Sequence, residues 1–113
     1  KGFDSFCPLG PWYVREIPAG AQLQTFVNNE ETPRQSASIA NMIFSPEYLV
    51  AYISQTMTLL PGDVVLTGTP EGVGPVNMGD RIRIEIEGIG CLENTVHLAA
   101  QNEAPVSKEL ALQ

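Results

Sequence analysis

Hydrophobic and charged residues alternate without interruption between residues 81 and 87. The alternation predicts a β-strand that directs Ile82, Ile84 and Ile86 to one face and its charged side chains to the other. Gly88-Ile89-Gly90 predicts a turn, and residues 91–98 predict a partner strand that returns beside the first. The charged face could serve as a carboxylate site. Alternating arginine and glutamate more often form a self-neutralising surface, and we favour that interpretation.

Two further stretches have the composition of strands. Residues 22–28 lead into Asn28-Asn29, and asparagine tolerates the positive φ of a hairpin turn. The return strand is expected near residues 32–36, where Pro33 restricts it to a sheet edge or a late start. The apolar run at residues 64–66, bounded by turn residues, predicts a buried strand that ends at Thr67 or Gly68.

One α-helix is predicted near residues 46–58. Ser45 can cap it, Pro46 suits the first helical position, and Glu47 is favourable at the positive end of the helix dipole. The residues that follow at helical spacing give a mostly apolar face: Leu49, Tyr52, Ile53, Thr56 and Leu60. Pro61-Gly62 is expected to stop the helix. The fold class is therefore mainly β with a single clear helix.

The two ends of the chain have little regular pattern. Residues 1–12 contain two prolines and two glycines and predict an irregular segment. We expect its large apolar side chains to pin it onto the core: Phe3, Phe6, Leu9 and Trp12. Residues 99–113 predict a loose C-terminal tail after a domain at residues 1–98.

Composition and charge narrow the function classes. The 113 residues suffice for one modest core, and a net charge of −7 should repel nucleic acid and anionic membranes. No apolar run approaches the ~20 residues of a membrane span. Cys7 and Cys91, far apart in the sequence, fit a reducing cytoplasm better than a disulfide scaffold. His97 is the only histidine, which argues against a Ser-His-Asp catalyst and a zinc site.

Residues 61–75 join the predicted strand at residues 64–66 to a loop dense in glycine and proline. Thr69 would lie on this loop just after the strand, where a hydroxyl and backbone N–H groups can hold an anionic group. A structural turn is the simpler interpretation of the same residues. Local sequence alone favours the turn, because glycine and proline are first of all turn residues.

Seven short motifs follow one another across about residues 1–96: Lys1-Gly-Phe-Asp-Ser-Phe-Cys-Pro-Leu-Gly-Pro-Trp12, Arg34-Gln35, Met42-Ile-Phe44, Pro61-Gly-Asp63, Thr67-Gly-Thr-Pro-Glu-Gly-Val-Gly74, Gly79-Asp80 and Glu87-Gly-Ile-Gly90. In order and spacing they resemble the C-terminal part of the fumarylacetoacetate hydrolase family. The resemblance is closest to the bacterial branch that includes 2-hydroxyhepta-2,4-diene-1,7-dioate isomerases, related decarboxylases and acylpyruvate hydrolases.

The resemblance implies a mixed β-roll or β-barrel-like fold in a cytoplasmic homodimer of aromatic catabolism. It also implies a Mg²⁺ or Mn²⁺ site that holds a small 2-oxo or enol (di)carboxylic acid and stabilises an enolate. The family's metal carboxylates, a Glu-x-Glu pair and a later Asp, precede its Lys-x-Phe-Asp motif. The direct ligands are thus expected upstream of this chain, in a missing N-terminal segment of the same protein, and the fragment alone is expected to be inactive.

Four residues of this chain match family positions with a role. Lys1 would stabilise the developing oxyanion as the catalytic cation, and Ser5 would support the water shell of the metal. Thr69 would hydrogen-bond the substrate carboxylate, on a loop shaped by Gly68. Each has a simpler interpretation: Lys1 as a solvated side chain, Ser5 as a turn cap and Thr69 as a partner of backbone alone. The resemblance favours the functional interpretation for Lys1 and Thr69 and leaves Ser5 open.

Two functional hypotheses of different class stand at this point. The first is an enzyme that catalyses isomerisation, decarboxylation or C–C hydrolysis, with the isomerase favoured. The alternative is a non-catalytic remnant of the fold that serves as a binding or oligomerisation module.

Overall fold

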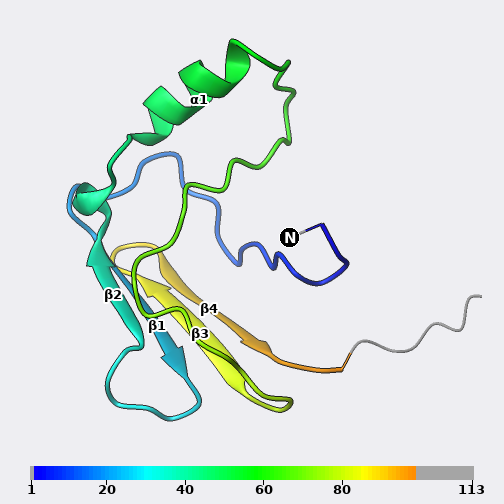
Figure 1. The fold of residues 1–113 in the computed structure, drawn as a ribbon. Helices are drawn as coiled ribbons and strands as arrows, with labels where there is room; N and C mark the ends of the chain where they lie inside the picture. Colours follow the sequence, from blue (N-terminus) through cyan, green and yellow to red (C-terminus); the bar gives the residue numbers. More distant parts are fainter. Residues whose placement is uncertain (1, 99–113) are drawn as a thin grey trace, which may run out of the picture.

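The computed structural model describes residues 2–98, so Lys1 and the predicted tail at residues 99–113 lie outside the described residues. Within 2–98 the chain forms a four-stranded antiparallel sheet in the order β2-β1-β3-β4 (Figure 1). The elements are β1 (Gln22–Val27), β2 (Gln35–Ser38), the 3-10 helix η1 (Ile39–Asn41), α1 (Pro46–Ser54), β3 (Arg81–Ile86) and β4 (Gly90–Thr95). The predicted mainly β fold with one α-helix is confirmed.

Strand register gives the sheet an apolar face and a polar face. Leu23 pairs with Ile86, Thr25 with Ile84 and Val27 with Ile82, so the isoleucines of β3 share a face with Leu23 and Val27 of β1, whereas Phe26 pairs with Arg83 on the other face. Arg83, Glu85 and Glu93 lie on the opposite face. The predicted strand at residues 81–87 and its turn are confirmed, and the partner strand ends at Thr95 instead of residue 98.

The hairpin between β1 and β2 starts its return later than predicted. β2 begins at Gln35, after Pro33, which has no N–H to donate to a ladder. The backbone N–H of Arg34 donates to the carbonyl oxygen of Thr25 at 2.8 Å and makes the first link between the strands. Asn28 has φ +57°, the positive φ expected of this turn. The strand therefore lies at the edge of the described sheet and also starts late, so both possibilities that Pro33 allows are met.

Helix α1 begins where the sequence predicts and ends early. The Ser45 hydroxyl accepts a hydrogen bond from the backbone N–H of Tyr48 at 3.2 Å, and Pro46 is the first helical residue. The helix was expected to reach about residue 58, but it ends at Ser54. The N–H groups of Gln55 and Thr56 donate to carbonyls three residues back, the tighter spacing with which helices finish. No helix among residues 2–98 has the length and apolar character needed to cross a membrane.

Two predictions of burial are wrong for the described part of the chain. Residues 64–66 form no strand, and Val64 and Leu66 are 55% and 57% exposed. No strand within residues 2–98 pairs with this run, so its backbone stays unpaired. The apolar side chains expected to pin the N-terminal segment onto the core are also more than half exposed: Phe3, Phe6, Leu9 and Trp12. Among the described residues only Ala21, Phe26 and Val27 are buried.

The N-terminal segment nevertheless touches the sheet at the turn between β3 and β4. A Cβ added to Gly88 would lie 2.8 Å from Cγ of Pro18, and one added to Gly90 would lie 3.1 Å from Cδ1 of Trp12. Both glycines have positive φ. The two glycines therefore leave room for the segment to cross the tip of the hairpin.

Candidate functional site

The loop at residues 67–75 carries the predicted substrate residues and lies against the edge strand β2. It follows the unpaired run at residues 64–66, and two of its glycines have positive φ: Gly68 at +103° and Gly72 at +98°. Glycine adopts these angles without the steric cost that other residues meet. The loop is thus shaped by its glycines, as the sequence predicts.

Gln35, the first residue of β2, holds this loop by two hydrogen bonds. Its Nε2 donates to Oγ1 of Thr69 at 2.9 Å and to the carbonyl oxygen of Pro70 at 2.9 Å. Gln35 pairs with Thr25 across the β1–β2 ladder, so it lies on the apolar face of the sheet. The side chain is half-buried, whereas Thr69 is exposed.

The neighbouring Arg34 makes a second attachment. Its Nη1 donates to the carbonyl oxygen of Pro75 at 3.1 Å, and its Nε and Nη2 donate to the Glu30 carboxylate. The hydrogen bond from Arg34 lowers the pKa of Glu30, and the same contact raises the pKa of Arg34. The guanidinium therefore stays charged and fixed between the hairpin tip and the end of the loop.

Gly72 lets the loop approach the strand closely. A Cβ at this position would collide with the carbonyl oxygen of Arg34 and lie 3.2 Å from Cγ of Gln35. With the side-chain contacts of Arg34 and Gln35, this close approach fixes residues 69–75 against the start of β2. Neither role of Arg34-Gln35 was predicted. The pair belongs to the family motifs, but no local signal relates Gln35 to a threonine 34 residues later.

Among the predicted site residues that the structure describes, Thr69 and Gly68 lie together and Ser5 lies apart from them. Thr69 and Gly68 lie side by side on the anchored loop. Ser5 is exposed in a turn with φ +65°, closed by a 3.2 Å hydrogen bond from the N–H of Phe6 to the carbonyl oxygen of Phe3. No hydrogen bond within residues 2–98 joins Ser5 to the loop. Lys1 lies outside the described residues.

Carboxylates are ligands that Mg²⁺ and Mn²⁺ prefer, but those of Asp63 and Asp80 accept hydrogen bonds within turns. A carboxylate oxygen of Asp63 accepts from the N–H of Leu60 at 2.7 Å, and Asp80 accepts from the N–H of Asn77 at the same distance. The other oxygen of Asp80 accepts from Nδ2 of Asn28 at 2.9 Å. The hydrogen bonds from Asn28 and then Asn77 lower the pKa of Asp80. Both carboxylates thus have the structural role that turn residues are expected to have.

The described residues do not supply a donor set for Mg²⁺ or Mn²⁺. Among residues 2–98 no group of three histidine, cysteine, aspartate or glutamate side chains lies close enough to hold an ion. Such ions prefer several oxygen ligands, usually with carboxylates among them. A metal centre therefore does not fit these residues by themselves.

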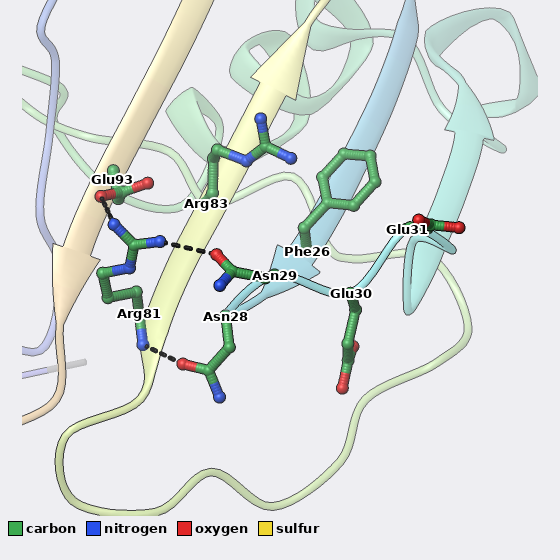
Figure 2. Close-up of a pocket in the computed structure, with 8 residues that line it drawn as sticks. All are labelled: Phe26, Asn28, Asn29, Glu30, Glu31, Arg81, Arg83 and Glu93. Atoms are coloured by element: carbon green, nitrogen blue, oxygen red, sulfur yellow. Dashed lines mark hydrogen bonds and ion pairs between the residues drawn. The ribbon is translucent and has the colours of Figure 1, made fainter.

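The polar face of the sheet contains a hollow of about 380 Å³, shown in Figure 2. Its arginines already have partners: Arg81 lies 3.5 Å from Glu93 and also donates to Asn29, and Arg83 lies over the Phe26 ring at 4.5 Å from its centroid. Arg83 also pairs with Glu85 at 2.6 Å. The hollow is a self-neutralised surface, as the alternating charges of residues 81–87 suggest.

Comparison with known proteins places these features in a family context. The model of the fumarylacetoacetate (FAA) hydrolase C-terminal domain matches residues 1–97. A solved structure of 5-carboxymethyl-2-hydroxymuconate delta-isomerase from Mycobacterium smegmatis is 47% identical, with a TM-score of 0.79, over 89% of this chain and 40% of that one. Maleylpyruvate hydrolase from Sphingobium sp. SYK-6, in complex with manganese(II) and pyruvate, is 41% identical, with a TM-score of 0.76, over 87% of this chain and 38% of that one.

A curated relative adds a third kind of activity. The 4-hydroxyphenylacetate degradation bifunctional isomerase/decarboxylase of Salmonella dublin is 43% identical over 100 residues, which are 85% of this chain and 23% of that protein. The chain spans two fifths or less of the length of each of these three relatives.

Proposed function

Because the chain belongs to the fumarylacetoacetate hydrolase family, we propose that it is part of a divalent-metal-dependent enzyme that acts on a small 2-oxo or enol (di)carboxylic acid. The observation that carries the proposal is the anchored loop at residues 67–75, which presents the exposed Thr69 hydroxyl beside Gly68. The named activities of the relatives support isomerisation, decarboxylation or hydrolysis as the reaction.

Thr69 is proposed to bind the substrate carboxylate. A threonine hydroxyl has one proton to donate, and a carboxylate accepts hydrogen bonds on both oxygens. The loop is held at three points along its length, by Gln35 at Thr69 and Pro70 and by Arg34 at Pro75. A donor fixed in this way orients a substrate before it reacts, and orientation is a large part of what such sites contribute.

The metal and its charge partner are proposed to lie outside the described residues. The relative crystallised with manganese(II) and pyruvate supports a divalent ion beside a 2-oxo acid. Residues 2–98 offer no donor set for that ion, so its ligands are assigned to parts of the protein beyond them. Lys1 keeps its proposed role as the cation beside the developing oxyanion.

An activity panel on the complete gene product tests the proposal. We expect turnover of at least one acylpyruvate, oxaloacetate or hydroxy-dienedioate, lost in EDTA and restored by Mn²⁺ or Mg²⁺. Thr69→Val should weaken substrate binding about tenfold or more, because one hydrogen bond to a charged group is lost, whereas Thr69→Ser should retain most of it. Thr95→Val, at an exposed position of β4, serves as the matched control.

The opposite result supports the second candidate, a binding or oligomerisation module. That candidate is motivated by exposed aromatic residues in and just before α1, where Tyr48 stacks between Phe44 and Tyr52. If the metal-loaded gene product turns over no member of the panel and Thr69→Val changes no binding, the enzyme proposal is wrong.

A further inference from the structure

We propose that Gln35 is a positioning residue that sets the direction of the Thr69 hydroxyl proton and so determines the affinity for the substrate carboxylate. This inference rests on the proposed function of Thr69. It goes beyond that function because it assigns a role to a residue of another element, on the edge strand β2.

The orientation of the Gln35 amide follows from its two partners. The carbonyl oxygen of Pro70 can only accept a hydrogen bond, so the amide nitrogen, and not the amide oxygen, must face it. The same nitrogen lies 2.9 Å from Oγ1 of Thr69. The NH₂ group has two protons, one for each acceptor. Both donors of Gln35 are thus used on the loop.

The contact assigns the two roles of the Thr69 hydroxyl. A hydroxyl oxygen has two lone pairs and one proton, and here one lone pair accepts from Gln35. The proton of Thr69 therefore stays available for a second acceptor at the exposed side of the loop. A carboxylate is such an acceptor, because it is acceptor-only when ionised.

The negative charge of the chain makes the neutral Thr69 hydroxyl more important for binding an anion. The chain has a net charge of −7, and the guanidinium of Arg34, the cation attached to the loop, is already paired with Glu30. An anionic substrate at the described part of this loop would therefore meet an oriented hydroxyl first. Substitutions that remove the donor at position 35 or replace it with an acceptor should therefore lower the affinity for the anion.

The test measures the dissociation constant for pyruvate, a 2-oxo acid, by calorimetry on the complete gene product in the presence of Mn²⁺. Gln35→Leu should weaken pyruvate binding about tenfold, as expected when one hydrogen bond is lost. In the Thr69→Val background the same substitution should have little further effect, because the hydroxyl through which Gln35 acts is absent. Gln24→Leu is the matched control: Gln24 is a half-buried glutamine of β1 on the opposite face of the sheet.

Gln35→Glu separates positioning from simple packing. An ionised glutamate can only accept hydrogen bonds, so it would accept the hydrogen bond of the Thr69 hydroxyl. Its negative charge would also repel an incoming carboxylate. At neutral pH, Gln35→Glu should bind pyruvate more weakly than Gln35→Leu does. Its affinity relative to the wild type at the same pH should recover as the pH falls, because the glutamate is then protonated. A residue that only fills space would give no such pH profile.

The outcomes distinguish this inference from the function on which it rests. If the wild type binds pyruvate and Thr69→Val weakens binding, but Gln35→Leu weakens it equally in both backgrounds or not at all, Gln35 is not a positioning residue and the proposed function stands. If the wild type neither binds pyruvate nor turns over any panel substrate, the proposed function and this inference are both wrong.

Discussion

At the scale of single residues, Gly72 decides how closely the loop can lie on β2. Its φ is +98°, and the space that a Cβ would need is taken by the carbonyl oxygen of Arg34. Both conditions exclude a side chain: the backbone angle is costly for an L-residue, and the obstructing atom belongs to the backbone. Gly68 meets only the first condition, because nothing lies within 4 Å of its added Cβ.

Gly72→Ala is therefore expected to destabilise the protein by about 1–3 kcal/mol, the usual cost of a strained backbone angle, and to move the loop away from Gln35. Urea unfolding of the complete gene product measures the first effect, and the dissociation constant for pyruvate the second. Gly74→Ala is the control, because its Cβ would enter open space. Equal stability of the two variants would contradict the close contact described at Gly72.

At the scale of elements, the turn after β1 is tied to the turn before β3. Asn28 donates from Nδ2 to Asp80 and accepts on Oδ1 from the N–H of Arg81 at 3.0 Å. The N–H of Asn28 also donates to the carbonyl oxygen of Arg81 at 2.7 Å. The two turns close the same end of neighbouring strands, so their side chains continue the ladder beyond β1 and β3.

This link predicts a dependence of stability on pH. The pKa of Asp80 in the folded protein lies below its ordinary value of 3.8, chiefly because of the hydrogen bond from Asn28. Near that value the unfolded chain binds more protons than the folded one, so the free energy of unfolding rises with pH. The stabilisation contributed by Asp80 is thus fully present at a pH above its ordinary pKa. It is lost as the pH falls through the lower pKa that Asp80 has in the folded protein.

Asp80→Asn should accordingly lower the free energy of unfolding at neutral pH, with a difference from the wild type that shrinks below about pH 4. Urea unfolding at several pH values measures it. In an Asn28→Gly background, where glycine still accepts the positive φ, the substitution should cost less because the donor is absent. A difference that stays constant from neutral to acid pH would contradict the role given to Asp80.

Elements with a local cause could be predicted, whereas contacts set by register could not. Ser45-Pro46 fixes the start of α1, and alternation fixes β3, because neighbouring residues contain the whole signal. Thr69 was predicted on its loop for the same reason. The sequence alone indicates no role for Gln35, since its contact with Thr69 exists only once the β1–β2 pairing and the turns of residues 67–75 bring the two residues together.

At the scale of the whole molecule, the described residues expose an unusual amount of apolar surface. Twenty large hydrophobic side chains are exposed within residues 2–98, and α1 makes no substantial contact with the described strands (Figure 1). Extended exposed apolar surface is typical of an interface with another part or another protein. The wrong predictions of burial at residues 3–12 and 64–66 share this cause: the pattern indicates apolar contact, and residues 2–98 do not contain the surface that makes it.

The 113-residue chain on its own is therefore expected to bind the dye ANS and to self-associate, whereas the complete gene product should do neither to a comparable degree. Dye fluorescence and sedimentation velocity at equal molar concentration measure the difference. A monomeric 113-residue chain without dye binding would show that the exposed side chains rearrange to cover one another.

The position of Gln35 at the start of an edge strand makes ligand binding depend on the length of the hairpin tip that precedes it. Side chains in a strand change face at every residue. A shift of β2 by one residue along β1 would turn the amide of residue 35 from the loop to the polar face. Insertion or deletion of a single residue between Asn28 and Arg34 is thus expected to weaken the site without touching any ligand-binding residue. Tolerance of length change in this tip should depend on whether the number of residues gained or lost is odd or even.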